Sequence, residues 1–288
     1  MQDSELSSDA YAPAQMAARV EAASITKINR DHASTFMLAL LAGAFIALGA
    51  VFYSFVIHDS SLSFGLTRLL GGLVFCLGLI LVVVAGAELF TGNNLIVMAF
   101  VSHKITLRQL ILNWGVVFIG NLFGALGVVL LIFLSGHWFE RGGAVGQAAL
   151  AIADHKVNLG FMQAIVLGIL CNILVCLAVW LCYSARSVTD KILAVLFPIT
   201  AFVALGFEHS VANMYLIPAG LVLKHSSDMA NHVETLAVAG QDLSALTLPG
   251  FLLNNLLPVT IGNIIGGGLF VAAVYWFVYL RRSGIQQG

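Results

Sequence analysis

Long uncharged apolar runs dominate this chain. Five of them, at 36–57, 69–87, 111–134, 161–182 and 256–280, reach the roughly 20 residues that a helix needs to cross a bilayer. A further apolar region, from Ile192 to Leu223, is long enough for one span plus a half, and Glu208 and His209 interrupt it near its centre. The pattern predicts an all-α membrane protein with six transmembrane helices.

Composition supports the bilayer as solvent. Hydrophobic residues make up 60% of the 288 residues, charged residues 9%, and the mean hydropathy is +0.97. The 13 Lys and Arg balance 14 Asp and Glu, which excludes the basic surface of a nucleic-acid-binding protein. The four cysteines lie inside apolar runs and are expected to pack as small hydrophobes, so we predict no metal site.

Positive residues predict the orientation. No apolar run precedes residue 36, so residues 1–35 are expected to be a cytoplasmic segment with an amphipathic helix and not a cleaved signal peptide. Residues 138–159 are expected to form a periplasmic loop, and 283–288 a cytoplasmic tail. Nine of the 13 Lys and Arg then lie on the side of both termini, as the positive-inside rule requires: Arg19, Lys27, Arg30, Lys104, Arg108, Arg186, Lys191, Arg281 and Arg282.

The two halves of the chain, 36–137 and 160–282, resemble each other span by span. Phe36-Met37 matches Phe161-Met162, Glu88 and Asn93 match Glu208 and Asn213, and Gly120-Asn121 with Gly124 matches Gly262-Asn263 with Gly266. Each half holds three spans, an odd number, so the second copy must enter the membrane upside down. The pattern predicts a 3+3 inverted repeat, an architecture that places its solute path near the midplane.

Both halves also carry a short apolar segment that cannot span alone. Uncharged stretches of 14 residues follow Glu88 and His209, and each begins with residues that suit a helix break, such as Thr91-Gly92-Asn93 in the first. Irregular backbone at membrane depth is tolerated only where protein or a water-filled cavity surrounds it. We therefore predict that the second and fifth helices are broken around one cavity.

The ionisable residues at these breaks are candidates for function. Glu88 and Glu208 are expected either to accept hydrogen bonds from broken-helix N–H groups and nearby asparagines or to contact the solute. His209 has no repeat mate, because Leu89 stands at the matching position, and an imidazole can offer a proton or a positive charge to an anion. Thr91 is expected to orient His209, bind the solute or repair the helix. Lys156, taken by spacing alone, is a solvated loop residue.

The residues at the breaks carry a resemblance. Ala87-Glu88-Leu89-Phe90-Thr91-Gly92-Asn93, the run from Gly206 to Asn213, and Ala153-Asp154-His155-Lys156-Val157 resemble the formate/nitrite transporter family, most of all its bacterial formate channels. The resemblance implies a homopentamer of aquaporin-like protomers in the inner membrane, each with its own pore. It implies that Lys156 attracts anions and that Asn172 and Asn213 line the pathway near Thr91 and His209. It also implies apolar constrictions at Leu79, Leu89 and Phe90 on one side and at Phe75 and Phe202 on the other.

These observations predict a formate channel without enzyme activity or cofactor. Formate is expected to pass through it in either direction, at a rate that depends on pH. No Walker-type phosphate loop is present, so no ATP is expected to drive it. Other small monovalent anions remain candidate solutes, and the alternatives are a nitrite or hydrosulfide channel of the same fold or, in another class, a membrane redox-enzyme anchor. The family suggests a formate-producing enzyme as a cytoplasmic partner.

Overall fold

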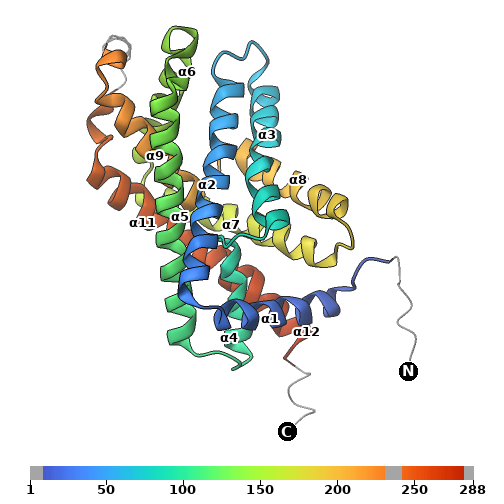
Figure 1. Cartoon of the computed structure of the whole chain (residues 1–288). Coiled ribbons are helices and arrows are strands. Elements are labelled where there is room, and N and C mark those ends of the chain that lie inside the picture. Colours follow the sequence, from blue (N-terminus) through green and yellow to red (C-terminus); the bar gives the residue numbers. More distant parts are fainter. Residues whose placement is uncertain (1–8, 231–241, 282–288) are drawn as a thin grey trace.

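The computed structural model describes residues 9–230 and 242–281, and all regular secondary structure in these ranges is helical (Figure 1). In chain order the elements are α1 (Pro13–Asn29), α2 (His32–Ile57), α3 (Phe64–Ala85), η1 (Gly92–Ile96), α4 (Val97–Val101), α5 (Leu107–Ser135), η2 (His137–Gly143), α6 (Ala144–Val157), α7 (Phe161–Ser184), α8 (Val188–Leu205), α9 (Ser210–Lys224), η3 (Ser227–Met229), η4 (Leu243–Ala245), η5 (Gly250–Leu256), α11 (Leu257–Ile264), η6 (Ile265–Ala273) and α12 (Val274–Tyr279).

Among the residues that the structure describes, six helices are long and apolar enough to cross a membrane. They are α2, α3, α5, α7, α8 and the continuous run from Gly250 to Tyr279, in which η5 and η6 are π-helical. Large apolar side chains cover their outer surfaces; Phe64 and Phe197, for example, are each 82% exposed. The chain is therefore a multi-pass membrane protein, and the prediction of six apolar spans is confirmed.

Two apolar helices are too short to cross. The run from Gly92 to Val101 follows α3, and α9 follows α8. The region from Ile192 to Leu223 accordingly contains most of one spanning helix, α8, and most of one short helix, α9, separated by residues 206–209. The short helices pack inside the bundle: α9 contacts α2, α5 and α6, whereas η1 contacts η6 and α7.

The segments outside the bundle are also helical. α1 lies across the end of the molecule that holds α4 and α12, and it buries Met16, Ala17 and Val20 against the bundle (Figure 1). Residues 138–159, expected as a loop, contain most of η2 and the whole of α6, and α6 lies at the opposite end from α1. The four cysteines are buried and unpaired, so they pack as small hydrophobes.

Close helix contacts hold each half of the bundle together. α5 approaches α2 so closely that a Cβ added at Gly124 would lie 1.9 Å from the carbonyl oxygen of Leu40. In the second half, a Cβ at Gly266 would lie 2.3 Å from the carbonyl oxygen of Ile169 on α7. Small residues let backbones approach in membranes, where dispersion and hydrogen bonds drive helix association. The two glycines therefore serve packing within the protomer.

The close contact at Gly124 predicts that alanine substitutions at two glycines of α5 differ in their effect on stability. Gly124→Ala should lower the apparent melting temperature of the detergent-solubilised protein, since forced overpacking typically costs about 1–3 kcal/mol. Gly127→Ala is the control, because nothing lies within 4 Å of its added Cβ. Scanning fluorimetry measures both. Equal melting temperatures for the two variants would contradict the close approach of α2 and α5.

Candidate functional site

The first interruption lies between α3 and η1. α3 ends at Ala85, and Gly86 follows with φ +82°, a left-handed conformation that glycine adopts without strain. Asn121 on α5 donates from Nδ2 to the carbonyl of Glu88 at 2.9 Å, and its Oδ1 accepts the N–H of Phe90 at 2.9 Å. One buried amide thus pairs with two backbone groups that no helix satisfies.

The second interruption, between α8 and α9, has the same hydrogen bonds. α8 ends at Leu205, and Gly206 follows with φ +75°. Asn263 on α11 donates from Nδ2 to the carbonyl of Glu208 at 3.0 Å, and its Oδ1 accepts the N–H of Ser210 at 2.9 Å. Asn121 and Asn263, which the sequence presents only as a match between the two halves, are therefore the side chains that hold the two interruptions.

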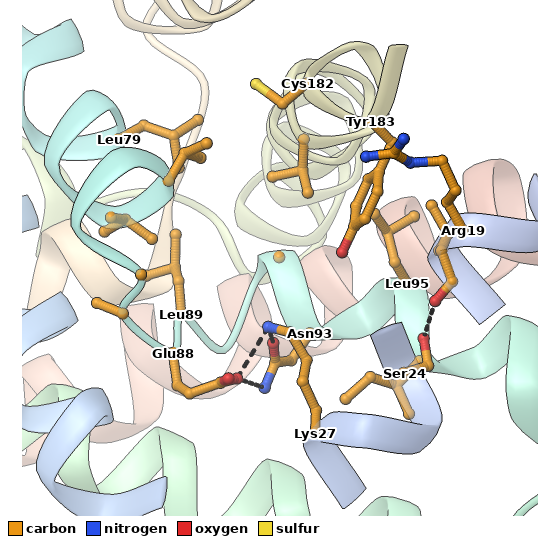
Figure 2. Close-up of a pocket in the computed structure, with 18 of the residues that line it drawn as sticks. Arg19, Ser24, Lys27, Leu79, Glu88, Leu89, Asn93, Leu95, Cys182 and Tyr183 are labelled. Carbon is orange, nitrogen blue, oxygen red and sulfur yellow. Dashed lines mark hydrogen bonds and ion pairs between the residues drawn. The ribbon is translucent and has the colours of Figure 1, made fainter. Parts of the chain in front are cut away.

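Glu88 lies at the centre of a polar cluster that faces α1. Its carboxylate accepts from Lys27 at 2.9 Å, from Arg30 at 2.6 Å and from Asn93 at 2.8 Å. Figure 2 shows Glu88 and Lys27 meeting at Asn93, whose Oδ1 accepts a second bond from Lys27 at 2.7 Å. The side chain is only 3% exposed, so these partners offset the cost of burying its charge.

Glu208 has an equivalent set of partners from other elements. Lys156 of α6 donates to it at 2.7 Å, Asn213 of α9 at 2.7 Å and Asn255 of η5 at 3.2 Å. Lys156 is thus half of a buried ion pair rather than a solvated loop residue. The asparagines near both glutamates bind them, which is one of the two roles that the sequence left open.

Three residues of these clusters were missed in the sequence. In the sequence, Lys27 and Arg30 indicate only the orientation of the chain, and no local pattern marks Asn255. The offset of 142 that relates Asn121 to Asn263 also relates Asn113 to Asn255, and both bond the cluster asparagine of their own half. Extending that match would have identified Asn255. No local signal connects α1 to Glu88.

His209 and Thr91 meet across the two interruptions. His209 Nε2 lies 2.8 Å from the Thr91 hydroxyl, and both residues are buried. His209 Nδ1 accepts the N–H of Ala212 at 3.0 Å, as an N-cap of α9. Because Nδ1 is an acceptor, the ring proton of neutral His209 is on Nε2, which donates to Thr91. The hydroxyl proton of Thr91 is then not used in the bond to His209.

Two side chains of α7 hold the backbone of Thr91 by hydrogen bonds to its carbonyl. The Thr91 carbonyl accepts from Asn172 Nδ2 at 3.3 Å and from Cys176 Sγ at 3.3 Å. Asn172 also donates to Asn94 Oδ1 at 2.7 Å. Asn172 therefore contacts Thr91 through the backbone, whereas the resemblance implied that Asn172 lines the pathway.

Three cavities follow one another along the path on which His209 lies. The α1-side cavity, about 310 Å³, has Lys27, Glu88 and Asn93 in its wall (Figure 2). The α6-side cavity, about 300 Å³, is lined by Lys156 and Glu208 among others. A central cavity of about 10 Å³, which is roughly the space of one water, shares wall residues with both. The shared residues are Leu79 and Leu89 on the α1 side and Phe75, Phe202 and His209 on the α6 side.

Of the other residues expected along the pathway, some line a cavity and some do not. Asn213 lines the α6-side cavity, whereas Thr91 and Asn172 are not among the residues that line these three cavities; Thr91 reaches the path only through its hydrogen bond to His209. Phe90 is also absent from their walls; it packs edge-on against Trp114 and Phe118, with ring centroids 6.1 and 5.0 Å apart. Four of the five apolar residues expected at constrictions therefore surround the central cavity, and Phe90 does not.

Positive charge predominates at both ends of this path. The α1-side cavity is lined by Arg19, Lys27, Arg30 and Lys191 against the single carboxylate of Glu88, a net charge of +3. The α6-side cavity is lined by Arg68 and Lys156 against Glu208, a net charge of +1 with His155 neutral. The central cavity between them is lined by apolar side chains and His209. The positive charge at both ends of the path attracts anions, and the apolar restriction at its centre opposes their passage.

Known proteins resemble this chain in sequence and in structure. A sequence profile described as formate/nitrite transporter matches residues 14–277. The formate channel FocA of Escherichia coli strain K12 is 48% identical over 96% of this chain and 96% of its own length. The formate channel FocA of Haemophilus influenzae is 42% identical over 94% of this chain and 95% of its own.

A solved structure agrees with these matches. A pentameric formate channel with formate bound superposes with a TM-score of 0.78 at 44% identity, covering 87% of this chain and 98% of that one. The family resemblance seen in the sequence is thus confirmed along nearly the whole length, and the chain belongs to the formate/nitrite transporter family.

Proposed function

We propose that this protein is a formate channel, which lets formate cross the inner membrane in either direction along its gradient. The observation that carries the proposal is the row of three cavities, positively charged at both ends and narrowest beside His209 and Thr91. The relatives named above are formate channels at 42–48% identity. They are channels rather than enzymes, which supports a protein without enzyme activity.

The same comparisons support the assembly. The pentameric channel covers 87% of this chain, so we propose a homopentamer in which every protomer has its own path. We propose further that each protomer is a 3+3 inverted repeat whose second and fifth helices are broken. The equivalent hydrogen bonds of Asn121 and Asn263 support this, as do the equivalent ion pairs of Glu88 and Glu208.

We propose that the α1-side cavity opens to the cytoplasm and the α6-side cavity to the periplasm. The supporting observation is the placement of α1 and α12 at one end of the molecule, with α6 at the other (Figure 1). Most Lys and Arg lie on the segments at the α1 end, as the positive-inside rule requires for a cytoplasmic face. A formate-producing enzyme bound at that face remains a prediction.

We infer the following passage for the anion. Cations draw formate into either outer cavity, and the ring pair Phe75 and Phe202, 5.7 Å apart and edge-on, narrows the path on the α6 side. Leu79 and Leu89 narrow it on the other. A bare charge is penalised there, and a hydrogen bond or a proton supplied through His209 and Thr91 lowers that barrier. Glu88 and Glu208 act structurally, by holding the helices with their cationic partners.

The first test is uptake of labelled formate, nitrite and hydrosulfide into liposomes at two pH values. Formate should be taken up fastest, and its uptake should depend on pH because His209 is the titratable group at the narrow point. His209→Asn should remove that pH dependence while keeping an acceptor for the Ala212 N–H, and His209→Phe should remove both. Faster nitrite or hydrosulfide uptake would favour the alternative channels, and an unchanged pH response in both variants would contradict the role of His209.

The Thr91 hydroxyl predicts a second result. Thr91→Val keeps the shape but removes the donor, and formate flux should fall about tenfold, the factor that 1.4 kcal/mol of lost hydrogen bonding gives. Thr91→Ser keeps the hydroxyl and should keep most of the flux. Both are measured by stopped-flow uptake in proteoliposomes. If Val and Ser behaved alike, the hydroxyl would not contact the solute.

The ion pair of Lys156 and Glu208 predicts that a second substitution restores the stability that the first one removes. Lys156→Met leaves a buried carboxylate unpaired and should destabilise the protein by about 3–5 kcal/mol. The double variant Lys156→Met/Glu208→Gln removes both charges and should recover most of the melting temperature and the pentamer peak in size-exclusion chromatography. A double variant no more stable than the single one would show that Lys156 does not stabilise the fold through Glu208.

A further inference from the structure

Arg68 occupies an unusual place in the wall of the α6-side cavity. It lies in the first turns of α3 and reaches across to the end of α8, where Nε donates to the carbonyl of Ala204 at 3.0 Å and Nη2 to that of Val203 at 2.8 Å. Its third nitrogen, Nη1, donates to the Tyr53 hydroxyl at 2.9 Å. The guanidinium is therefore held in one position beside the second interruption.

The charge of Arg68 is not balanced in the way that the charge of Lys156 is. Lys156 donates to Glu208 at 2.7 Å, so the pair has no net charge. Within residues 9–230 and 242–281, no carboxylate forms an ion pair with Arg68; its acceptors are two carbonyls and a phenol. The net charge of +1 in this cavity is therefore the charge of Arg68.

The surroundings of the guanidinium leave that charge effective. The carbonyl end of a helix carries about half a negative charge, so the end of α8 offsets Arg68 only in part. A guanidinium has five N–H donors, and three donate to the protein contacts above, which leaves two. A fixed cation with free donors binds a carboxylate with little loss of conformational freedom.

We propose that Arg68 is the side chain that concentrates small carboxylates in the α6-side cavity and so sets the affinity of the channel for formate on that side. The proposal rests on the proposed function, since it names the charge that acts on the solute. Lys156, which the resemblance assigned to this task, contributes mainly to the stability of the interruption through Glu208. Arg68 is thus a residue that determines anion affinity, and it also caps α8.

The test separates charge from helix capping by comparing Arg68→Gln with Arg68→Lys. The lysine keeps the positive charge but cannot reproduce three nitrogen contacts from one planar group, whereas the glutamine keeps a donor and loses the charge. Right-side-out membrane vesicles expose the α6 side in the proposed orientation. With labelled formate outside, Arg68→Gln should raise the half-saturating concentration about fivefold at low salt, and Arg68→Lys should stay near wild type.

Salt provides a second readout that capping alone would not change. Raising the salt concentration outside the vesicles should abolish the difference in half-saturating concentration between Arg68→Gln and wild type, because salt screens the cation. Sucrose brings the low-salt samples to the same osmolarity. Raising the internal salt should leave the difference in place. The proposal is overturned if Arg68→Gln equals wild type, if both variants are impaired alike, or if the difference ignores external salt. Wild-type vesicles that take up no formate would instead overturn the proposed function.

Discussion

Two buried asparagine side chains carry the constraint on which the rest of this protein depends. A helix that ends inside a bilayer leaves N–H and C=O groups that no water can satisfy. Asn121 and Asn263 each bond two backbone groups of an interruption, and each also bonds a carbonyl of the first span of its half, Ala39 on α2 and Gly168 on α7 respectively. The interruptions are thereby fixed to intact spans, so the side chains between them face the path in defined positions.

The two interruptions share the hydrogen bonds of their asparagines and glutamates but differ in the residue that follows the glutamate. Leu89 in the first corresponds to His209 in the second, and only the imidazole can bond both its own helix and the opposite interruption. Nδ1 caps α9, and Nε2 reaches Thr91. The cap fixes the ring, its orientation and its neutral tautomer at once. A polar contact at the narrowest point therefore follows from a helix start that the fold needs in any case.

The sequence predicts the spans well because length and hydropathy are local properties, as in α2 and α7. It also marks where a short apolar helix follows each long one, since Glu88 and Glu208 separate the apolar runs. It does not predict the partners of those glutamates: Lys27 lies 61 residues from Glu88, and packing alone brings α1 across the bundle. Phe90 shows the same limit. Its position beside Leu89 suggests the path, but its ring turns to Trp114 and Phe118.

Burial explains why the cations along the path divide into two groups. A lysine or arginine that compensates a buried carboxylate, as Lys156 does, is needed for the fold, and its field is largely cancelled by its partner. A cation bound only to carbonyls and hydroxyls keeps most of its charge, so it acts on ions in the neighbouring cavity. Arg68 belongs to the second group, although it also caps a helix. The attraction of anions on the α6 side is therefore produced by Arg68, the cation without a carboxylate partner, and not by Lys156, whose charge is paired with Glu208.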